Sequence, residues 1–207
     1  MSTPYNTAAL HTLGCKVNFT ETSTISRQFQ EKGVSIVDLD ESADIYVINT
    51  CSVTENANRK CNKLVRSLKN KNPEAFIVVT GCYAQLQYKQ LTNNKYIDLV
   101  VGTEQKLDIP EIVIRQLKSA YISETDKIKD FQLSYSSNDR VRSFIKIQDG
   151  CDYNCSFCTI PMARGKSRSA TIQEVINLTN LLEEKGFNEI VLSGINLGDF
   201  GRGGDET

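Results

Sequence analysis

One stretch of the sequence reads Ile45-Tyr46-Val47-Ile48-Asn49-Thr50-Cys51, in which the short apolar run Ile45–Ile48 is followed, after two polar residues, by a cysteine. Further runs of this kind occur at Ala8–Leu13, Phe76–Val79 and Ile97–Val101. Short and nearly continuous apolar segments are typical of strands that are covered on both faces. Helical patterns lie between them, at residues 21–32, 55–71, 84–94 and 107–118. This alternation predicts an α/β fold with a doubly wound parallel sheet over residues 1–118.

Three cysteines occupy the same place relative to these runs, just after the end of a predicted strand: Cys15, Cys51 and Cys82. The carboxyl ends of parallel strands lie on one rim of the sheet, where doubly wound folds bind ligands. The fold could therefore gather three thiolates that the sequence scatters. The alternative is that they are inert core cysteines. Cys61, at helical spacing with apolar neighbours, fits that second description, and we assign it to no site.

The pattern changes after residue 118. Residues 119–141 are polar and without a clear period, which predicts a connection between domains. A strand over Ser143–Gln148 follows, then a helix that opens on a capping box at Thr171–Glu174, then a strand at Glu189–Ser193. We therefore predict a second domain over residues 142–207.

The composition is that of an ordinary globular protein, with 40% apolar and 24% charged residues among 207. The net charge of −1 gives no overall field that would attract nucleic acid. No apolar run approaches the roughly 20 residues that span a bilayer, and the first residues do not resemble a signal peptide. We expect a cytoplasmic protein without membrane contact. In such a protein, seven cysteines favour metal binding or catalysis over disulfides.

A second group of cysteines lies in the segment Gly150-Cys151-Asp152-Tyr153-Asn154-Cys155-Ser156-Phe157-Cys158. With the spacing C-x3-C-x2-C, three thiolates can hold three irons of a cubane cluster and leave the fourth iron open for chemistry. Structural zinc prefers four ligands, and no further Cys or His follows in this sequence. A redox C-x-x-C pair would leave Cys151 unused. We predict an iron–sulfur site here, with zinc and redox sites as the alternatives.

The triplet is followed by Thr159-Ile160-Pro161-Met162-Ala163-Arg164-Gly165, and together they resemble the cluster loop of radical S-adenosylmethionine enzymes. The resemblance implies that Cys151, Cys155 and Cys158 are the catalytic cluster ligands and that the open iron binds S-adenosyl-L-methionine. Reductive cleavage of that cofactor would yield a radical that abstracts hydrogen from an unreactive carbon. The resemblance also implies a partial (βα) barrel, of which residues 142–207 would be only the beginning. We therefore expect the chain to be a piece of a longer enzyme.

The segments around the strand-end cysteines are similar to three motifs of the methylthiotransferases. They are Thr12–Asn18, Asn49–Thr54 and Thr80–Gln85. In that family these cysteines hold an auxiliary [4Fe-4S] cluster that carries or receives the sulfur to be inserted. The resemblance thus implies two [4Fe-4S] clusters, with Cys15, Cys51 and Cys82 as ligands of the second one.

Three branches of this family differ in their substrates, which are N6-isopentenyladenosine in tRNA, an aspartate of a ribosomal protein, and N6-threonylcarbamoyladenosine in tRNA. At the first cysteine, the first branch typically reads Gly-Cys-Gln-Met-Asn and the second Gly-Cys-Pro-Lys-Asn. This chain reads Gly14-Cys15-Lys16-Val17-Asn18, which looks like the third branch. The resemblance then implies addition of a methylthio group to C2 of threonylcarbamoyladenosine near the anticodon. Its partners would be tRNA and a reductant protein such as a flavodoxin or ferredoxin. A non-catalytic iron–sulfur module is the alternative from another functional class.

Three other side chains are candidate cofactor contacts. We expect Arg164, which lies in a basic group with Lys166 and Arg168, to contact the carboxylate of S-adenosylmethionine or a tRNA phosphate; a solvated loop is the alternative. Tyr153 and Phe157 lie inside the cluster loop, and we expect them to cover the cluster against water or to stack on adenine. Both clusters must act on one atom, so we expect them to face a shared cavity between the domains. The target base must leave its stack to enter that cavity.

Overall fold

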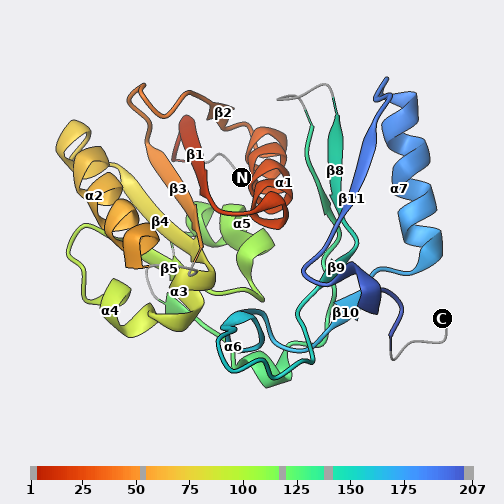
Figure 1. Cartoon of the computed structure of the whole chain (residues 1–207). Coiled ribbons are helices and arrows are strands. Elements are labelled where there is room, and N and C mark those ends of the chain that lie inside the picture. Colours follow the sequence, from red (N-terminus) through yellow and green to blue (C-terminus); the bar gives the residue numbers. More distant parts are fainter. Residues whose placement is uncertain (1–3, 52–54, 117–119, 138–141, 203–207) are drawn as a thin grey trace.

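The computed structural model describes residues 4–51, 55–116, 120–137 and 142–202 (Figure 1). Its N-terminal part contains a six-stranded, wholly parallel sheet in the order β2-β1-β3-β4-β5-β6. The strands are β1 (Thr7–Leu13), β2 (Ser35–Ile36), β3 (Ile45–Thr50), β4 (Phe76–Gly81), β5 (Leu99–Val101) and β6 (Ala120–Tyr121). The predicted doubly wound parallel sheet is confirmed. Its order reverses at β1 and β3, the switch point beside which such folds bind ligands.

Helices cover both faces of this sheet (Figure 1). On one face lie α1 (Lys16–Glu31) and α5 (Ile109–Ile114), and on the other α2 (Glu55–Lys71), α3 (Cys82–Leu86) and α4 (Tyr88–Thr92). Each face has its own apolar core, and every residue of β3 and β4 is buried. This two-sided burial explains why the strands read as nearly continuous apolar runs.

The observed helices differ from the predicted ones at three places, whereas α2 has the predicted bounds. The helix α1 begins at Lys16 because its first turns bury polar side chains, which hide the apolar period. The segment predicted as one helix over 84–94 is broken at Gln87 into α3 and α4. The helix predicted at 107–118 is a 3-10 turn, Lys106–Asp108, followed by α5. Residues 117–118 of that prediction lie outside the described residues.

The C-terminal part contains a sheet in the order β11-β8-β7, formed by β7 (Ser134–Tyr135), β8 (Ser143–Lys146) and β11 (Ile190–Ser193). The helix α7 (Ile172–Glu184) packs on it through Leu178 and Leu182 and opens on the predicted capping box. The antiparallel strands β9 (Gln148–Asp149) and β10 (Arg168–Ser169) and the helix α6 (Ile160–Arg164) flank the cysteine triplet. Two further 3-10 turns lie at Thr125–Lys127 and Leu197–Asp199.

The segment 119–141, predicted as a connection, contributes to both sheets. Its residues 120–121 form β6 beside β5, and its residues 134–135 form β7 beside β8. Residues 119 and 138–141 lie outside the described residues, and the domain boundaries at 118 and 142 remain a prediction. The same holds for residues 52–54 of the second cysteine motif and 203–207 at the end, which are not described. None of the described helices has both the length and the apolar character that crossing a bilayer requires.

The helix α1 lies between the two sheets (Figure 1). On one side it packs Ile25 and Phe29 into the core of the first sheet. On the other, its Phe19 ring meets the Phe144 ring of β8 edge to face at 6.3 Å between centroids, and its Thr20 hydroxyl pairs with that of Ser134 at 2.9 Å. Polar residues of α1 are therefore buried against the second sheet rather than exposed to water.

Candidate functional site

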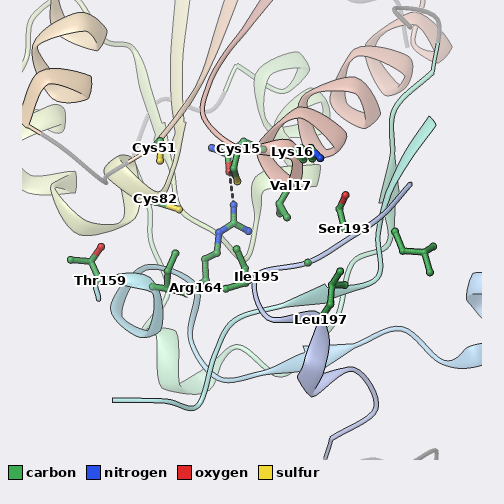
Figure 2. Close-up of a pocket in the computed structure, with 14 residues that line it drawn as sticks. Cys15, Lys16, Val17, Cys51, Cys82, Thr159, Arg164, Ser193, Ile195 and Leu197 are labelled. Atoms are coloured by element: carbon green, nitrogen blue, oxygen red, sulfur yellow. Dashed lines mark hydrogen bonds between the residues drawn. The ribbon is translucent and has the colours of Figure 1, made fainter. Parts of the chain in front are cut away.

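A cavity of about 460 Å³ lies where the carboxyl ends of the first sheet meet the second sheet (Figure 2). Cys15, Cys51 and Cys82 all line it, from the ends of β1, β3 and β4. The remaining lining residues come from α1, from the end of the triplet loop and α6, and from the end of β11: Lys16, Val17, Asn18, Thr159, Ile160, Arg164, Leu192, Ser193, Gly194, Ile195 and Leu197. The fold thus gathers the three scattered cysteines at one cavity, while their role as cluster ligands remains a prediction.

Hydrogen bonds fix the strand ends that carry these cysteines. The Asn18 amide donates to the Thr50 carbonyl at 2.9 Å, and its Oδ1 lies 3.7 Å from Cys15 Sγ. The Thr50 hydroxyl donates in turn to the Thr80 carbonyl. Gly81 has a φ of 99°, and a Cβ there would lie 2.2 Å from the Thr50 carbonyl oxygen. Only glycine therefore allows the chain to turn at this point and place Cys82 beside the end of β3.

The donor set at this cavity fits a group larger than one metal ion. Among the described residues, no three His, Cys, Asp or Glu side chains are close enough together to hold a single ion. A tetrahedral zinc ion would draw its thiolates to within about 4 Å of one another. Three thiols spread around a cavity of about 460 Å³ suit the larger body of an iron–sulfur cluster.

The cysteine triplet lies on an irregular loop between β9 and α6. The Cys151 amide donates to the Gly165 carbonyl at 3.1 Å, and the Cys158 amide to the Cys155 carbonyl at 3.0 Å. Cys155 is exposed, whereas Cys151 and Cys158 are half-buried. The triplet thiols are not among the residues that line the cavity, but Thr159 and Ile160, which directly follow them, are. The structure therefore places the loop beside the cavity, and a cluster on its three thiols remains a prediction.

Gln148 anchors this loop and was not found from the sequence. Its side-chain amide donates to the Gly150 carbonyl at 2.8 Å and to the Ser167 hydroxyl at 3.0 Å. Its Oε1 accepts the backbone amides of Ile195 at 2.9 Å and Asn196 at 2.8 Å. One buried side chain therefore links the triplet loop to the end of β11, which forms another wall of the cavity.

The structure corrects the predicted role of Arg164. Its side chain is fully buried, not part of a solvated basic loop. Its NH1 donates to Glu21 at 3.1 Å and Asp149 at 2.8 Å, and its NH2 to Asn18 at 2.6 Å and Glu21 at 3.4 Å. Because NH1 and NH2 already donate to protein acceptors, they are not available to the carboxylate of S-adenosylmethionine or to a tRNA phosphate. Figure 2 shows the side chain reaching from α6 toward the three cysteines.

Arg164 belongs to a buried charge network, which consists of Glu21, Lys106, Lys146, Asp149 and Arg164. Glu21 accepts from Lys106 Nζ at 2.6 Å and from Lys146 Nζ at 3.3 Å. Burial raises the pKa of Glu21, but its three cationic partners outweigh burial and hold that pKa well below its usual value. Burial likewise opposes ionisation of Asp149, yet Arg164, Lys146 and Arg168 lower its pKa to about 2.

One signal for this network is visible in the sequence of α1. Val17, Glu21 and Ile25 follow one another at intervals of one helical turn, so they share a face of α1. A carboxylate on an apolar helical face requires buried partners, because an unpaired buried charge is very costly. The partners themselves come from distant segments and could not be identified without the fold.

Tyr153 and Phe157, the two aromatic residues of the triplet loop, are largely exposed. Phe157 is 88% exposed and Tyr153 49% exposed, and neither lines the cavity. The Tyr153 hydroxyl accepts from Arg202 NH1 at 2.9 Å and lies 3.4 Å from Asp199, which turns the ring toward the 3-10 turn at Leu197–Asp199. Their expected role, to shield the cluster or stack on adenine, stays a prediction.

The reactivity of each cysteine should depend on whether its thiol is buried or exposed. Burial raises the pKa of Cys61 to about 12, and its side chain is fully buried in the core between α2 and the sheet, whereas Cys15 and Cys155 are exposed. We expect iodoacetamide at pH 8 to alkylate Cys15 and Cys155 of the metal-free protein more than about a hundredfold faster than Cys61, because only the thiolate reacts. Mass spectrometry of timed peptide digests measures these rates, and equal rates would contradict the described packing of α2.

Two parts of the chain match models of known protein families. Residues 7–102 match the model of Uncharacterized protein family UPF0004, and residues 145–202 match that of the Radical SAM superfamily. The first match contains the three strand-end cysteines, and the second contains the triplet.

Several curated proteins are similar over most of the chain. Threonylcarbamoyladenosine tRNA methylthiotransferase MtaB of Aquifex aeolicus is 38% identical over 201 residues, which is 93% of this chain and 48% of the relative. MtaB of Bacillus subtilis is 38% identical, covering 94% of this chain and 45% of the relative. The tRNA-2-methylthio-N(6)-dimethylallyladenosine synthase of Thermodesulfovibrio yellowstonii is 32% identical, covering 92% and 46%. The chain therefore spans about half the length of the curated relatives it matches.

Proposed function

We propose that this chain, which belongs to the radical S-adenosylmethionine methylthiotransferase family, carries the two iron–sulfur sites of an enzyme that modifies tRNA. The reaction we propose is addition of a methylthio group to C2 of N6-threonylcarbamoyladenosine near the anticodon. One observation carries the proposal. The three strand-end cysteines line a single cavity, whose facing wall includes the residues that directly follow the cysteine triplet.

The chain's own residues would supply binding and orientation. Cys151, Cys155 and Cys158 would hold one [4Fe-4S] cluster, and Cys15, Cys51 and Cys82 the other. When bound, the first cluster with S-adenosylmethionine supplies a radical able to remove the C2 hydrogen, which is not acidic. The apolar part of the cavity lining suits a base that has left its stack; it comprises Val17, Ile160, Leu192, Ile195 and Leu197.

Lys16 supports the threonylcarbamoyladenosine branch. It directly follows Cys15, is exposed, and lines the cavity, where Arg164 is the other charged lining residue and already has carboxylate partners. The Lys16 Nζ lies 5.2 Å from the Phe144 ring centroid, and no described carboxylate pairs with it. A threonylcarbamoyl group carries a carboxylate, whereas an isopentenyl group is neutral and apolar. A cation at this wall therefore favours the former substrate.

We expect Lys16→Gln in the full-length protein to reduce kcat/KM about tenfold for tRNA that bears threonylcarbamoyladenosine, because one charge-assisted contact is lost. Activity on tRNA that bears isopentenyladenosine should not fall. Lys63→Gln, an exposed lysine of α2 outside the cavity lining, is the matched control. Equal losses of kcat/KM in Lys16→Gln and Lys63→Gln would show that Lys16 attracts tRNA in general and does not recognise the modified base.

The direct test of the substrate is mass spectrometry of tRNA nucleosides from a strain that lacks the full-length gene. The proposal expects methylthio-threonylcarbamoyladenosine to disappear and its precursor to accumulate. Unchanged levels would contradict the proposed substrate, and loss of the methylthio-isopentenyl nucleoside instead would favour the other tRNA branch. A non-catalytic iron–sulfur module is tested separately, because anaerobic incubation with S-adenosylmethionine and dithionite would then give no 5′-deoxyadenosine.

A further inference from the structure

Arg164 has one hydrogen-bond donor that the described protein does not satisfy. A guanidinium group carries five N–H hydrogens. The NH1 and NH2 groups donate to Asn18, Glu21 and Asp149, whereas the buried Nε has no partner among the described residues. A buried donor without an acceptor is costly, so such an atom marks a place where an acceptor is expected.

The cavity with the three cysteines is the place where this acceptor would lie. Arg164 lines that cavity, and in Figure 2 the Nε side of the guanidinium faces Cys82. The ion pairs of NH1 with Glu21 at 3.1 Å and with Asp149 at 2.8 Å hold the guanidinium in one orientation at this wall of the cavity.

We propose that Arg164 is a positioning residue for the auxiliary cluster, and that its Nε–H donates a hydrogen bond to the Cys82 thiolate or to the cluster sulfide beside it. The inference rests on the proposed function in one respect, namely that Cys15, Cys51 and Cys82 hold an iron–sulfur cluster. It adds a donor from the triplet side of the cavity, because Arg164 ends α6, the helix that follows the triplet.

The other contacts of Arg164 connect the segments that carry the two cysteine sites. Asn18 lies three residues after Cys15, and Asp149 lies two residues before Cys151. One guanidinium therefore connects the segment after the first auxiliary cysteine with the segments before and after the triplet. It would fix the separation of the two cluster sites while its Nε–H stabilises the negative charge of the auxiliary cluster. Hydrogen bonds to cluster sulfurs raise the reduction potential and strengthen retention of the cluster.

The test uses the full-length protein with Cys151, Cys155 and Cys158 changed to Ala, so that only the auxiliary cluster can be loaded. In this background, we expect Arg164→Lys to make the midpoint potential of the cluster more negative and to release iron to a chelator about tenfold faster. Arg168→Lys is the matched control, because Arg168 also pairs with Asp149, at 3.3 Å, but does not line the cavity. It should leave the potential unchanged and iron release within about twofold.

A second measurement detects contact between Arg164 and the cluster directly, in protein with the native arginine. The same three-alanine protein, grown with ¹⁵N-labelled arginine, should show a weakly coupled ¹⁵N nucleus in pulsed EPR of the reduced cluster, and this coupling should vanish in Arg164→Lys. A lowered unfolding temperature with unchanged potential, unchanged iron release and no ¹⁵N coupling would make Arg164 merely structural and overturn the inference. Absence of iron from the three-alanine protein would instead refute the auxiliary cluster of the proposed function.

Discussion

Replacing Cys15, Cys51 and Cys82 together by alanine in the full-length protein should halve its iron content, from about eight to about four atoms per monomer. Methylthio transfer should fall below detection, because the sulfur site is lost. Cleavage of S-adenosylmethionine to 5′-deoxyadenosine should persist, because Cys151, Cys155 and Cys158 lie on a separate loop. Iron assay after anaerobic reconstitution and chromatographic analysis of both products measure these three quantities.

The matched control for this experiment is Cys61→Ala. Cys61 is fully buried in the core between α2 and the first sheet and does not line the cavity. This variant should keep about eight iron atoms and both products, although loss of the buried sulfur lowers its stability somewhat. Loss of all iron from the variant that lacks Cys15, Cys51 and Cys82 would show that the two sites are not independent. An unchanged iron content in that variant would show that these three cysteines bind no iron.

Glu21→Gln should be the most destabilising single substitution in the buried charge network. Glu21 is 2% exposed and contacts Lys106, Lys146 and Arg164, so the change leaves three buried cations with one carboxylate, Asp149, among them. Breaking a buried ion pair on one side costs about 3–5 kcal/mol. The free energy of unfolding from urea titration of the metal-free protein should fall by that amount. The matched control is Glu111→Gln, an exposed carboxylate with two cationic partners, which should scarcely move the urea midpoint.

The pH dependence of stability gives a second readout for the same substitution. The folded-state pKa of Glu21 lies well below its usual value, and that of Asp149 is about 2. A depressed folded-state pKa stabilises the fold above the unfolded pKa of about 4 and loses this contribution as the pH falls through the folded value. The protein should therefore lose stability steeply between about pH 4 and pH 2, and Glu21→Gln should flatten this fall. A variant with the same slope as the parent would show that Glu21 does not contribute to acid unfolding.

The strands of the first sheet that bear the cysteines could be predicted from the sequence, because each is marked by a local apolar run. The runs at β1, β3, β4 and β5 are apolar on both faces, and each predicted strand forms, with bounds shifted by one to two residues at several ends. The placement of three cysteines at strand ends then followed from the parallel topology alone. The helix α1 was predicted too short because its first turns face a second sheet. The periodicity of the sequence predicts that the polar residues of these turns are exposed to solvent, but in the structure they are buried.

The parts of the site that short sequence motifs encode could be predicted. The contacts that the fold makes between distant segments could not. The triplet spacing and the strand-end cysteines were visible in the sequence. The role of Arg164 was misread because a basic loop residue beside Lys166 and Arg168 suggests an external contact, whereas its partners Glu21 and Asn18 lie more than a hundred residues away. Gln148 was missed for the same reason, since its link to Ile195 and Asn196 exists only after β11 pairs with β8.

The central claim is that the protein has two separate thiol sites, one lining the cavity and the other on the loop beside it. Anomalous X-ray diffraction at the iron absorption edge, on crystals of the anaerobically reconstituted full-length protein, tests it most directly. We predict two groups of iron peaks, one among Cys15, Cys51 and Cys82 and the other on the loop of Cys151, Cys155 and Cys158, with the cavity between them. A single group of peaks at the triplet, with the three strand-end sulfurs bare in a fully loaded crystal, would contradict the account.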